Sequence, residues 1–242
     1  MKFRTASLSE QGGRDVNQDH CGYRILDKGG CWVVADGLGG HRGGEVASQL
    51  AVNTILDRFE AAMGFEAEDL FSYVQAAQEA LIAKQAEEPR LTSMRTTLVV
   101  MVSDFSTARW AHMGDTRLYL LQGGSAQYRT KDHSVPQAMV DAGDIVEDDM
   151  RGHEDRNRLL RALGKEGDLR PAILEKPYTL HQGDAFLLAT DGFWEYVWEP
   201  EMEISYCKSA NPDEWLMRME RRITQRAESD FDNYSALGVF VD

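Results

Sequence analysis

The alternation of apolar and polar positions divides the chain into strands and helices. Short apolar runs bounded by turn residues predict strands over residues 3–9, 20–36, 172–180, 184–190 and 234–241. Between residues 97 and 122 the runs are short and rich in β-branched or aromatic residues. They predict an antiparallel meander with Gly114-Asp115 in one corner and Gly123-Gly124 in the next.

Longer stretches repeat their apolar residues every three or four positions and therefore predict helices. One such stretch covers residues 43–62, and a second covers residues 66–87 and ends before Pro89. A third helix begins at Asn211, a good N-cap residue, with Pro212 in its first turn. The apolar residues expected to form its buried face are Trp215, Leu216, Met219 and Ile223.

Residues 132–164 interrupt this regular pattern. They are polar, with short helical stretches and no sustained strand pattern, so we expect a mobile segment here. Neither a repeat nor a linker divides the chain, and we treat residues 1–242 as a single domain. Helices interspersed with antiparallel strands predict a layered α+β domain.

The composition excludes several classes of protein. A hydrophobic content of 43% fits a soluble globular chain. No apolar run approaches the ~20 residues that span a bilayer, and the first residues lack the apolar core of a signal peptide. The cysteines Cys21, Cys31 and Cys207 form no CxxC pair, which fits a reducing compartment. We therefore expect a cytoplasmic protein without membrane contact, and a Cys21–Cys31 disulfide between adjacent strands is the disfavoured alternative.

The chain is acidic, with 26 basic and 40 acidic residues and a formal net charge of −14. Such a charge repels the phosphate backbone of nucleic acids, so we expect no nucleic-acid partner. It repels phosphorylated proteins as well. Divalent cations bound at one site would reverse the sign of the field there, so part of the negative charge can serve such a site.

Two aspartates follow strongly apolar runs. Residues 32–35 lead into Asp36, residues 186–190 lead into Asp191, and glycine follows each aspartate. This pattern places a carboxylate at the end of each predicted strand, where glycine allows a sharp turn. Several carboxylates that converge would repel one another unless a cation lay between them. Oxygen ligands without Cys or His favour Mg²⁺ or Mn²⁺ over zinc.

Each of these short motifs has an ordinary structural explanation when it is taken alone. Asp-Gly is a common turn sequence, and Gly114-Asp115 between two predicted strands is typical of a hairpin corner. The order in which the motifs follow one another is what distinguishes them from isolated turns.

A series of such motifs runs from residue 14 to residue 235. In chain order they are Arg14-x-x-Asn17-Gln18-Asp19, Val34-Ala35-Asp36-Gly37-Leu38-Gly39-Gly40-His41, Gly44-Glu45-Val46-Ala47-Ser48, Thr96-Thr97, Met113-Gly114-Asp115-Thr116-Arg117, Lys131-Asp132-His133-Ser134, Arg161-Ala162-Leu163-Gly164, Ala189-Thr190-Asp191-Gly192-Phe193-Trp194 and Asp232-Asn233-Tyr234-Ser235. The series resembles the metal-dependent Ser/Thr protein phosphatases (protein phosphatase type 2C, the PPM family), in particular their small single-domain bacterial members.

The resemblance implies a fold and an activity. The fold is α+β, a four-layer α-β-β-α sandwich in which two central antiparallel sheets lie between pairs of helices, with a flap over about residues 132–164. The activity is hydrolysis of phosphoserine and phosphothreonine in proteins. A hydroxide that bridges two metal ions would attack phosphorus directly, without a covalent phosphoenzyme.

The resemblance also implies a ligand set for two Mn²⁺ or Mg²⁺ ions. Asp36 bridges the two ions, the Gly37 carbonyl oxygen joins it on one of them, and Asp191 and Asp232 complete the other. Asp115, together with Asp191, matches a third metal site of the bacterial members.

The resemblance also implies roles for further residues near the predicted metals. Asp19 is expected to accept a hydrogen bond from a metal-bound water and to orient it. Arg14 is the candidate phosphate clamp, because a guanidinium group matches two phosphate oxygens; taken alone, it would be a solvated turn arginine. His41 is a candidate general acid, with a structural hydrogen bond as the favoured alternative. Gln18 stands where many members carry Glu, so we expect weaker binding of the second metal.

The resemblance to small bacterial members of the family also implies partners. They are phosphoprotein substrates, a bacterial Ser/Thr kinase that the phosphatase opposes and forkhead-associated-domain proteins, and we expect a monomer. One alternative is a pseudophosphatase that acts as a binding module, although Asp36, Asp191 and Asp232 are all present. The other is a two-metal phosphodiesterase, which the acidic charge disfavours.

Overall fold

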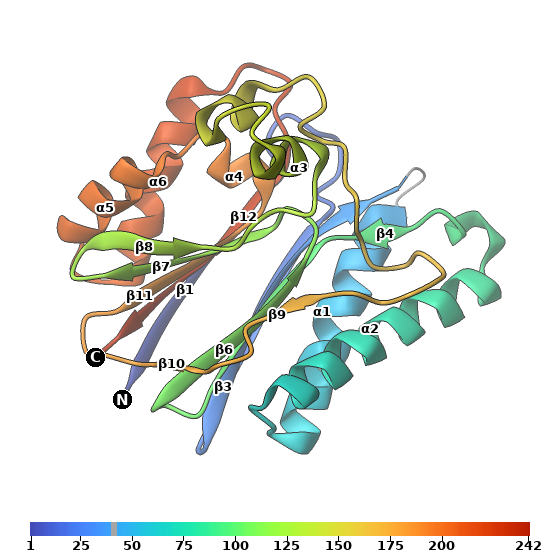
Figure 1. Ribbon diagram of the computed structural model, residues 1–242, viewed down its shortest axis with the longest axis horizontal. Coiled ribbons are helices and arrows are strands. Elements are labelled where there is room, and N and C mark those ends of the chain that lie inside the picture. Colours follow the sequence, from blue (N-terminus) through green and yellow to red (C-terminus); the bar gives the residue numbers. More distant parts are fainter. Residues whose placement is uncertain (40–42) are drawn as a thin grey trace.

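The computed structural model describes residues 1–39 and 43–242, and two antiparallel sheets lie face to face at its centre (Figure 1). The first sheet has the strand order β1 (Phe3–Glu10), β12 (Tyr234–Val241), β11 (Ala185–Ala189), β7 (Arg117–Gln122) and β8 (Ser125–Arg129). The second has the order β10 (Tyr178–Thr179), β6 (Thr107–Met113), β5 (Leu98–Ser103), β3 (Gly29–Leu38) and β2 (Asp19–Leu26). Two short strands extend it, β4 (Arg95–Thr96) beside β3 and β9 (Ala172–Ile173) beside β6.

A pair of helices covers the outer face of each sheet (Figure 1). The second sheet packs against α1 (Gly43–Ala62) and α2 (Ala67–Glu87), and the first packs against α5 (Glu199–Cys207) and α6 (Pro212–Arg226). Four shorter helices complete the fold, namely η1 (Pro89–Leu91), α3 (Val135–Ala142), η2 (Glu147–Gly152) and α4 (Asp191–Trp194). The four-layer sandwich predicted from the sequence is confirmed.

Apolar side chains fill the three spaces between these four layers. Neighbouring residues of a strand point to opposite faces, so a strand buried on both faces is apolar at every position. In β3, Trp32 packs between the two sheets, and Val33 packs against α1 and α2. On the other side, Trp215 of α6 packs against the first sheet. The continuous apolar run of β3 therefore reflects burial on both sides.

Most of the predicted elements are confirmed. The helix over residues 43–62 and the strand over residues 234–241 have the predicted bounds. Asn211 caps α6, because its side-chain oxygen accepts a hydrogen bond of 2.9 Å from the backbone amide of Glu214. Gly123-Gly124 forms the predicted corner between β7 and β8.

The prediction of a hairpin corner at Gly114-Asp115 is wrong. β6 pairs with β5 in the second sheet, whereas β7 pairs with β11 and β8 in the first sheet. The segment between them therefore crosses from one sheet to the other. Leu118 packs between the sheets and Tyr119 packs against the layer of α5 and α6, so β7 is buried on both faces. The apolar pattern predicts that burial, but it does not specify which sheet accepts the strand.

Other parts of the chain differ from the prediction in detail. The stretch 172–180 contributes only the two-residue strands β9 and β10, and α4 and α5 follow β11 without having been predicted. Cys21 lies opposite Val34, while Cys31 lies opposite Arg24, and all three cysteines are free, so the disulfide alternative is wrong. Within the described part of the chain, none of the helices combines the length and the apolar character needed to cross a membrane.

The predicted flap, residues 132–164, contains α3 and η2 (Figure 1). Its last residues are attached to β4, because the backbone amide and carbonyl of Thr96 bond with Leu163 at 3.2 and 2.8 Å. Most of its side chains are exposed or partly exposed, with Met150 and Leu163 as buried apolar exceptions. The segment therefore rests on the end of the sandwich through few apolar contacts.

Candidate metal centre

Carboxylates gather in a cavity of about 350 Å³ at one end of the sandwich. We call it the carboxylate cavity. Its walls are formed by Arg14, Asp15, Val16, Gln18, Asp36, Gly37, Leu38, Gly39, Asp115, Asn157, Leu159, Asp191, Asp232 and Asn233. Five of these residues are aspartates, and Arg14 is the one basic residue among the described lining residues. The predicted metal ligands therefore lie around one space, although they are far apart in the sequence.

The two sheets deliver these aspartates from opposite sides. Asp36 lies in β3 of the second sheet, directly opposite Asp19 of β2. Asp191 follows β11 of the first sheet and begins α4, and Asp232 lies just before β12, which pairs with β11. Asp115 lies in the segment that crosses between the sheets. The cavity thus forms where the ends of the two central sheets meet.

The backbone around Asp36 is held by two threonines of the second sheet. The carbonyl oxygen of Asp36 accepts hydrogen bonds of 2.8 Å from the amide of Thr97 and 2.8 Å from the hydroxyl of Thr96. The amide of Asp36 donates to the hydroxyl of Thr97 at 3.1 Å. These contacts fix the main chain, so the orientation of the carboxylate depends little on local flexibility.

Glycines beside the aspartates allow close approach of backbone segments. A side chain at Gly37 would collide with the backbone of Gly44 at the start of α1. A side chain at Gly192 would collide with the backbone carbonyl of Asn233. Gly37 and Gly192 are therefore required for packing the neighbouring segments that shape the cavity.

Asp191 and Asp232 share a local arrangement. In each, the Oδ1 atom accepts a hydrogen bond from the amide of the next residue, at 2.7 Å from Gly192 and 2.8 Å from Asn233. These bonds orient the carboxylates and leave the second oxygen of Asp191 available. The second oxygen of Asp232 contacts Nη2 of Arg14 at 3.1 Å.

Without a bound cation, burial and mutual repulsion disfavour the ionised form of the carboxylates in this cavity. Burial, followed by repulsion from Asp191 and Asp19, raises the pKa of Asp36 well above its ordinary value. Burial and repulsion from Asp115 do the same to the pKa of Asp191. Burial and then the charge of Asp132 raise the pKa of Asp115 to about 7. A cation among these groups would remove the repulsion that opposes their ionisation.

The donor chemistry fits a hard divalent cation. Asp115 is buried, and its Oδ1 atom has no hydrogen-bond partner among the described residues. Asp36, Asp191 and Asp232 are only partly buried because they open into the cavity. Within residues 1–39 and 43–242, no three Asp, Glu, His or Cys side chains are already close enough together to hold a metal ion. The fit therefore rests on oxygen-only donors and on the orphaned oxygen of Asp115, which suit Mg²⁺ or Mn²⁺.

The remaining predicted site residues occupy different positions. Asp19 is buried behind the cavity wall, and its Oδ2 atom accepts a hydrogen bond of 2.8 Å from the hydroxyl of Thr190. Burial raises the pKa of Asp19 to about 7. Gln18 lines the cavity and donates to the carbonyl of Gly39 at 3.2 Å. Arg14 lies at the cavity rim with nearly half of its side chain exposed (47%), so it can reach a ligand from solvent. His41 lies outside the described residues.

The sequence assigned no role to a buried network that supports Asp115. Arg117 donates from Nε and Nη2 to the two carboxylate oxygens of Asp132, at 2.8 and 2.7 Å. The same guanidinium lies 3.4 Å from the ring centroid of Trp194, and Trp194 donates to the carbonyl of Asp115 at 3.0 Å. The signal was present, since Arg117 belongs to the motif of Asp115, Trp194 to that of Asp191, and Asp132 to the motif Lys131-Asp132-His133-Ser134, but their mutual contact is visible only in three dimensions.

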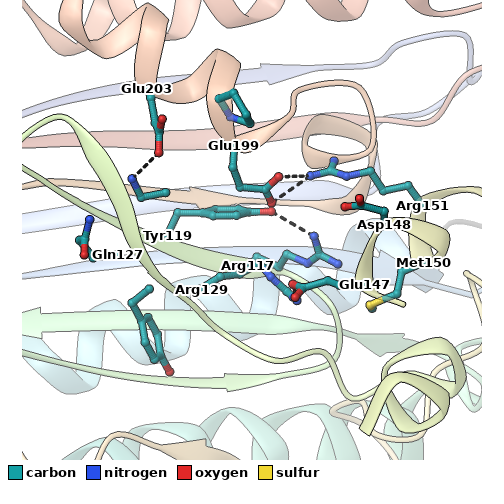
Figure 2. A pocket seen from close by; sticks show the side chains of 13 residues that line it. Arg117, Tyr119, Gln127, Arg129, Glu147, Asp148, Met150, Arg151, Glu199 and Glu203 are labelled. Carbon is teal, nitrogen blue, oxygen red and sulfur yellow. Dashed lines mark hydrogen bonds and ion pairs between the residues drawn. The ribbon is translucent and has the colours of Figure 1, made fainter. Parts of the chain in front are cut away.

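Arg117 of this network also lines a second cavity (Figure 2). It has a volume of about 390 Å³ and lies among β7, β8, η2 and α5. We call it the ion-paired cavity. Its charged lining residues are Arg117, Arg129, Glu147, Asp148, Arg151, Glu199 and Glu203.

Each arginine of the ion-paired cavity has a carboxylate partner. Arg151 bonds both oxygens of Glu199, at 2.8 and 3.0 Å, as Figure 2 shows. Arg129 pairs with Glu147, and Arg117 pairs with Asp132 behind the wall. Burial alone would raise the pKa of Glu147, but the hydrogen bond and charge of Arg129 bring it below the ordinary value. The protein itself therefore supplies the cations that pair with Glu147, Glu199 and Asp132.

Comparison with known proteins places this arrangement in a family. The sequence model of the family described as protein phosphatase 2C matches residues 9–226. The chain is 35% identical over 196 residues to the serine/threonine phosphatase stp of Listeria innocua, which covers 78% of this chain and 77% of that protein.

Two solved structures are similar over nearly their whole length. The catalytic domain of the protein phosphatase PstP in complex with two manganese ions is 26% identical, with a TM-score of 0.84 and coverage of 99% of each chain. PppA of Pseudomonas aeruginosa, described as a key regulatory component of T6SS, is 29% identical, with a TM-score of 0.78 and coverage of 100% of this chain and 99% of that one.

Proposed function

The chain belongs to the protein phosphatase 2C family and is a metal-dependent protein serine/threonine phosphatase, and we propose that the carboxylate cavity is its active site. The observation that supports this assignment most strongly is the imbalance of charge in that cavity. Its lining contains five aspartates and, among the described residues, a single arginine. Such a lining needs cations from outside the protein, as a metal-dependent active site does.

Two divalent ions, Mn²⁺ or Mg²⁺, would be held between the two sheets in this proposal. The residues that would hold them are Asp36, Asp191 and Asp232, together with the carbonyl oxygen of Gly37. A bound pair of such ions supplies an activated water as nucleophile and neutralises charge on the phosphoryl group. The bonds from Thr96 and Thr97 would keep Asp36 in place during this reaction.

Arg14 is proposed to bind the substrate phosphoryl group. A guanidinium group can donate two parallel hydrogen bonds to phosphate oxygens. Arg14 now contacts Asp232 at 3.1 Å, and both side chains are nearly half exposed, so this surface ion pair is weak enough to exchange for a substrate contact. Binding of a cation to Asp232 would also free Arg14, because the carboxylate charge would then be shared.

Asp19 is proposed to orient the attacking water from behind Asp36. It lies opposite Asp36 in the β2–β3 pair, and the hydroxyl of Thr190 holds one of its oxygens at 2.8 Å. The amide of Asp19 is in turn fixed by the side chain of Asn17 at 3.0 Å. These two hydrogen bonds fix the orientation of Asp19. A carboxylate held in this way is suited to accept a hydrogen bond from a water molecule.

Asp115 is proposed to hold a third ion together with Asp191. The support is its orphaned, buried Oδ1 atom and the electrostatic coupling between the two carboxylates. We expect Asp115→Ala to retain the two core ions, to lower kcat on protein substrates and to require a higher Mn²⁺ concentration. Calorimetric titration with Mn²⁺ measures this directly, and three retained binding events in the variant would contradict it.

The substrates, partners, location and oligomeric state that we propose are those implied by the family. The substrates are phosphoproteins, and a cognate Ser/Thr kinase and forkhead-associated-domain proteins are the proposed partners. The proposed location is the cytoplasm, and the proposed state is a monomer. The relatives that carry phosphatase names support the substrate class. The individual partners rest on the resemblance to small bacterial members alone.

A single assay tests the proposed active site. A phosphothreonine peptide is incubated with the protein in EDTA, in Mn²⁺ and in Mg²⁺, and phosphate release is measured. Activity should require a divalent ion, and Asp36→Asn should lower it by about a thousandfold or more while circular dichroism stays unchanged. Asp57→Asn, on the exposed side of α1, is the matched control and should keep full activity.

The alternatives give different results in the same assay. A wild-type protein that binds the peptide but never releases phosphate would be the binding module. Preferential hydrolysis of a phosphate diester would indicate the phosphodiesterase. Normal turnover by a folded Asp36→Asn protein would refute the metal assignment.

A further inference from the structure

A third hollow lies on the outer helical layer, between α5 and α6. It has a volume of about 280 Å³, and its charged lining residues are Lys208, Arg218, Arg221 and Arg222. No carboxylate is among the described residues that line it. We call it the arginine hollow. The chain has a net charge of −14, yet the charged residues that line this hollow are all basic.

The positive charges of the arginine hollow are poorly neutralised. Among the described residues, no carboxylate oxygen lies within 4.0 Å of the charged nitrogens of Lys208 or Arg221. Arg222 reaches Glu201 only at 3.8 Å, and Arg218 reaches Glu214 only at 4.0 Å. By contrast, Arg151 in the ion-paired cavity approaches its carboxylate to 2.8 Å.

The two nearby carboxylates are already engaged with other groups. Glu201 accepts hydrogen bonds of 2.7 and 2.6 Å from both terminal nitrogens of Arg226. Glu214 accepts a hydrogen bond of 2.8 Å from the amide of Ala210. Arg222 and Arg218 therefore keep most of their capacity to bind an anion.

The guanidinium group of Arg218 also has an unsatisfied donor. The Nε atom of Arg218 is buried, and it has no hydrogen-bond partner among the described residues. A buried donor without an acceptor is costly unless another group completes it. The other arginines of α6 do not do so, since a guanidinium group has donors and no acceptor.

We propose that the arginine hollow binds a phosphoryl group carried by a protein segment. A phosphoryl group offers three acceptor oxygens and close to two negative charges, which match several guanidinium donors at once. Ile204 lines the hollow, Met217 lies against Arg221, and both are nearly half exposed (49% and 42%), so apolar residues of a peptide have a surface to contact. An anionic membrane fits less well, because its broad surface would also meet the overall negative charge of the protein.

The arginine hollow shares no lining residue with the carboxylate cavity. A substrate with more than one phosphorylated residue would therefore be held at the hollow while another phosphoryl group enters the active site. This choice of occupant rests on the proposed function, whereas the anion site itself does not.

The test measures binding in the absence of turnover. Full-length protein in EDTA is titrated with a fluorescein-labelled phosphothreonine peptide, and anisotropy gives the dissociation constant. The measurement is made in an Arg14→Ala background, so that the active-site clamp contributes nothing. R221Q/R222Q should weaken binding by about tenfold or more, because two charge-assisted contacts are lost. K28Q/R58Q changes the net charge equally on the opposite side of the molecule and should leave binding unchanged.

The remaining arms distinguish the ligands. The unphosphorylated peptide should bind at least about tenfold more weakly, and inorganic phosphate should compete with the phosphopeptide. Vesicles that contain phosphatidylserine should not bind. Equal binding of both peptides, equal loss in the two double variants, or binding to vesicles in place of the phosphopeptide would each overturn the proposal.

A turnover arm separates this proposal from the proposed function. R221Q/R222Q should hydrolyse p-nitrophenyl phosphate as the wild type does, yet show a lower kcat/KM on a doubly phosphorylated peptide. If the wild-type protein released no phosphate at all, the proposed function would fail, while the titration in EDTA would still decide whether the hollow binds phosphate.

Discussion

The carboxylate cavity and the ion-paired cavity are built from similar materials but differ in how their charges are balanced. Their volumes are about 350 and 390 Å³, and acidic side chains line both. In the ion-paired cavity every arginine contacts a carboxylate, and the buried Asp132 is held by Arg117 at 2.7 Å. In the carboxylate cavity, Arg14 is the one basic lining residue among those described, and it contacts only Asp232.

The difference is visible in the direction of the pKa shifts. Burial and mutual repulsion raise the pKa of Asp36 and that of Asp191, whereas Arg129 outweighs burial and lowers the pKa of Glu147. The arginines of one cavity are therefore paired within the protein, and the other cavity would gain stability from cations in solution. The comparison teaches that the number of acidic residues does not mark a metal site. What marks it is the set of carboxylates that the fold leaves without an internal cation.

The largest expected effect comes from removing the buried ion pair between Arg117 and Asp132 behind the ion-paired cavity. Asp132→Asn would leave the buried guanidinium of Arg117 without its counter-ion, which costs about 3–5 kcal/mol of unfolding free energy. Urea denaturation in EDTA measures this cost. Asp141→Asn is the matched control, because its ion pair with Lys131 is exposed (50% and 71%) and contributes about 0–1 kcal/mol. Similar losses in the two variants would show that Arg117 and Asp132 are not a tightly coupled buried pair.

The carboxylate cavity should respond in a different way, through pH. Without metal, Asp19 and Asp115 have pKa values of about 7 in the folded protein, above the ordinary value of 3.8. The folded state thus binds protons more tightly than the unfolded state, so this contribution to stability is complete below about pH 4 and is lost as the pH rises through 7. We expect the melting temperature in EDTA to fall by roughly 5–10 °C between pH 5 and pH 8.

Added Mn²⁺ should reverse that loss. The ion replaces the protons, so it should raise the melting temperature more at pH 8 than at pH 5. Asp36→Asn should reduce both the fall with pH and the response to Mn²⁺, because it removes one charge from the cluster. A melting temperature that is independent of pH in EDTA would contradict the assignment of unbalanced charge to this cavity.

The smallest expected effect concerns Arg14, the one arginine among the described residues that line the carboxylate cavity. Arg14→Ala should raise KM for a phosphopeptide by roughly tenfold, since a charge-assisted contact to phosphate is lost. Stability should change by only about 0–1 kcal/mol, because the Arg14–Asp232 pair is exposed. Arg24→Ala removes a similarly exposed ion pair, to Glu60 at 3.6 Å, and should leave kcat/KM unchanged. Steady-state kinetics that showed no difference between the two variants would remove the clamp role from Arg14.

Much of the fold could be predicted because its signals are local. The apolar spacing of α1, the Asn211 cap of α6 and the final strand β12 depend on neighbouring residues, and all three are confirmed. The crossing at Gly114-Asp115 was missed for the opposite reason. A strand buried on both faces has the same sequence pattern in either sheet, so its partner depends on contacts with distant β11.

The site, like the fold, has features that local sequence predicts and features that depend on distant contacts. The sequence by itself determined the oxygen-only character of the candidate ligands, the order of their motifs and the glycines that close packing requires. Only the tertiary structure decided that Asp132 is neutralised by Arg117 and that Arg151 is paired. It also decided that, among the described residues, Asp115 keeps an unpartnered oxygen and Arg221 has no carboxylate within 4.0 Å. The physical reason is that local sequence sets the burial of each residue and its chemistry, whereas the balance of charge depends on which distant side chains the packed sheets and helices bring together.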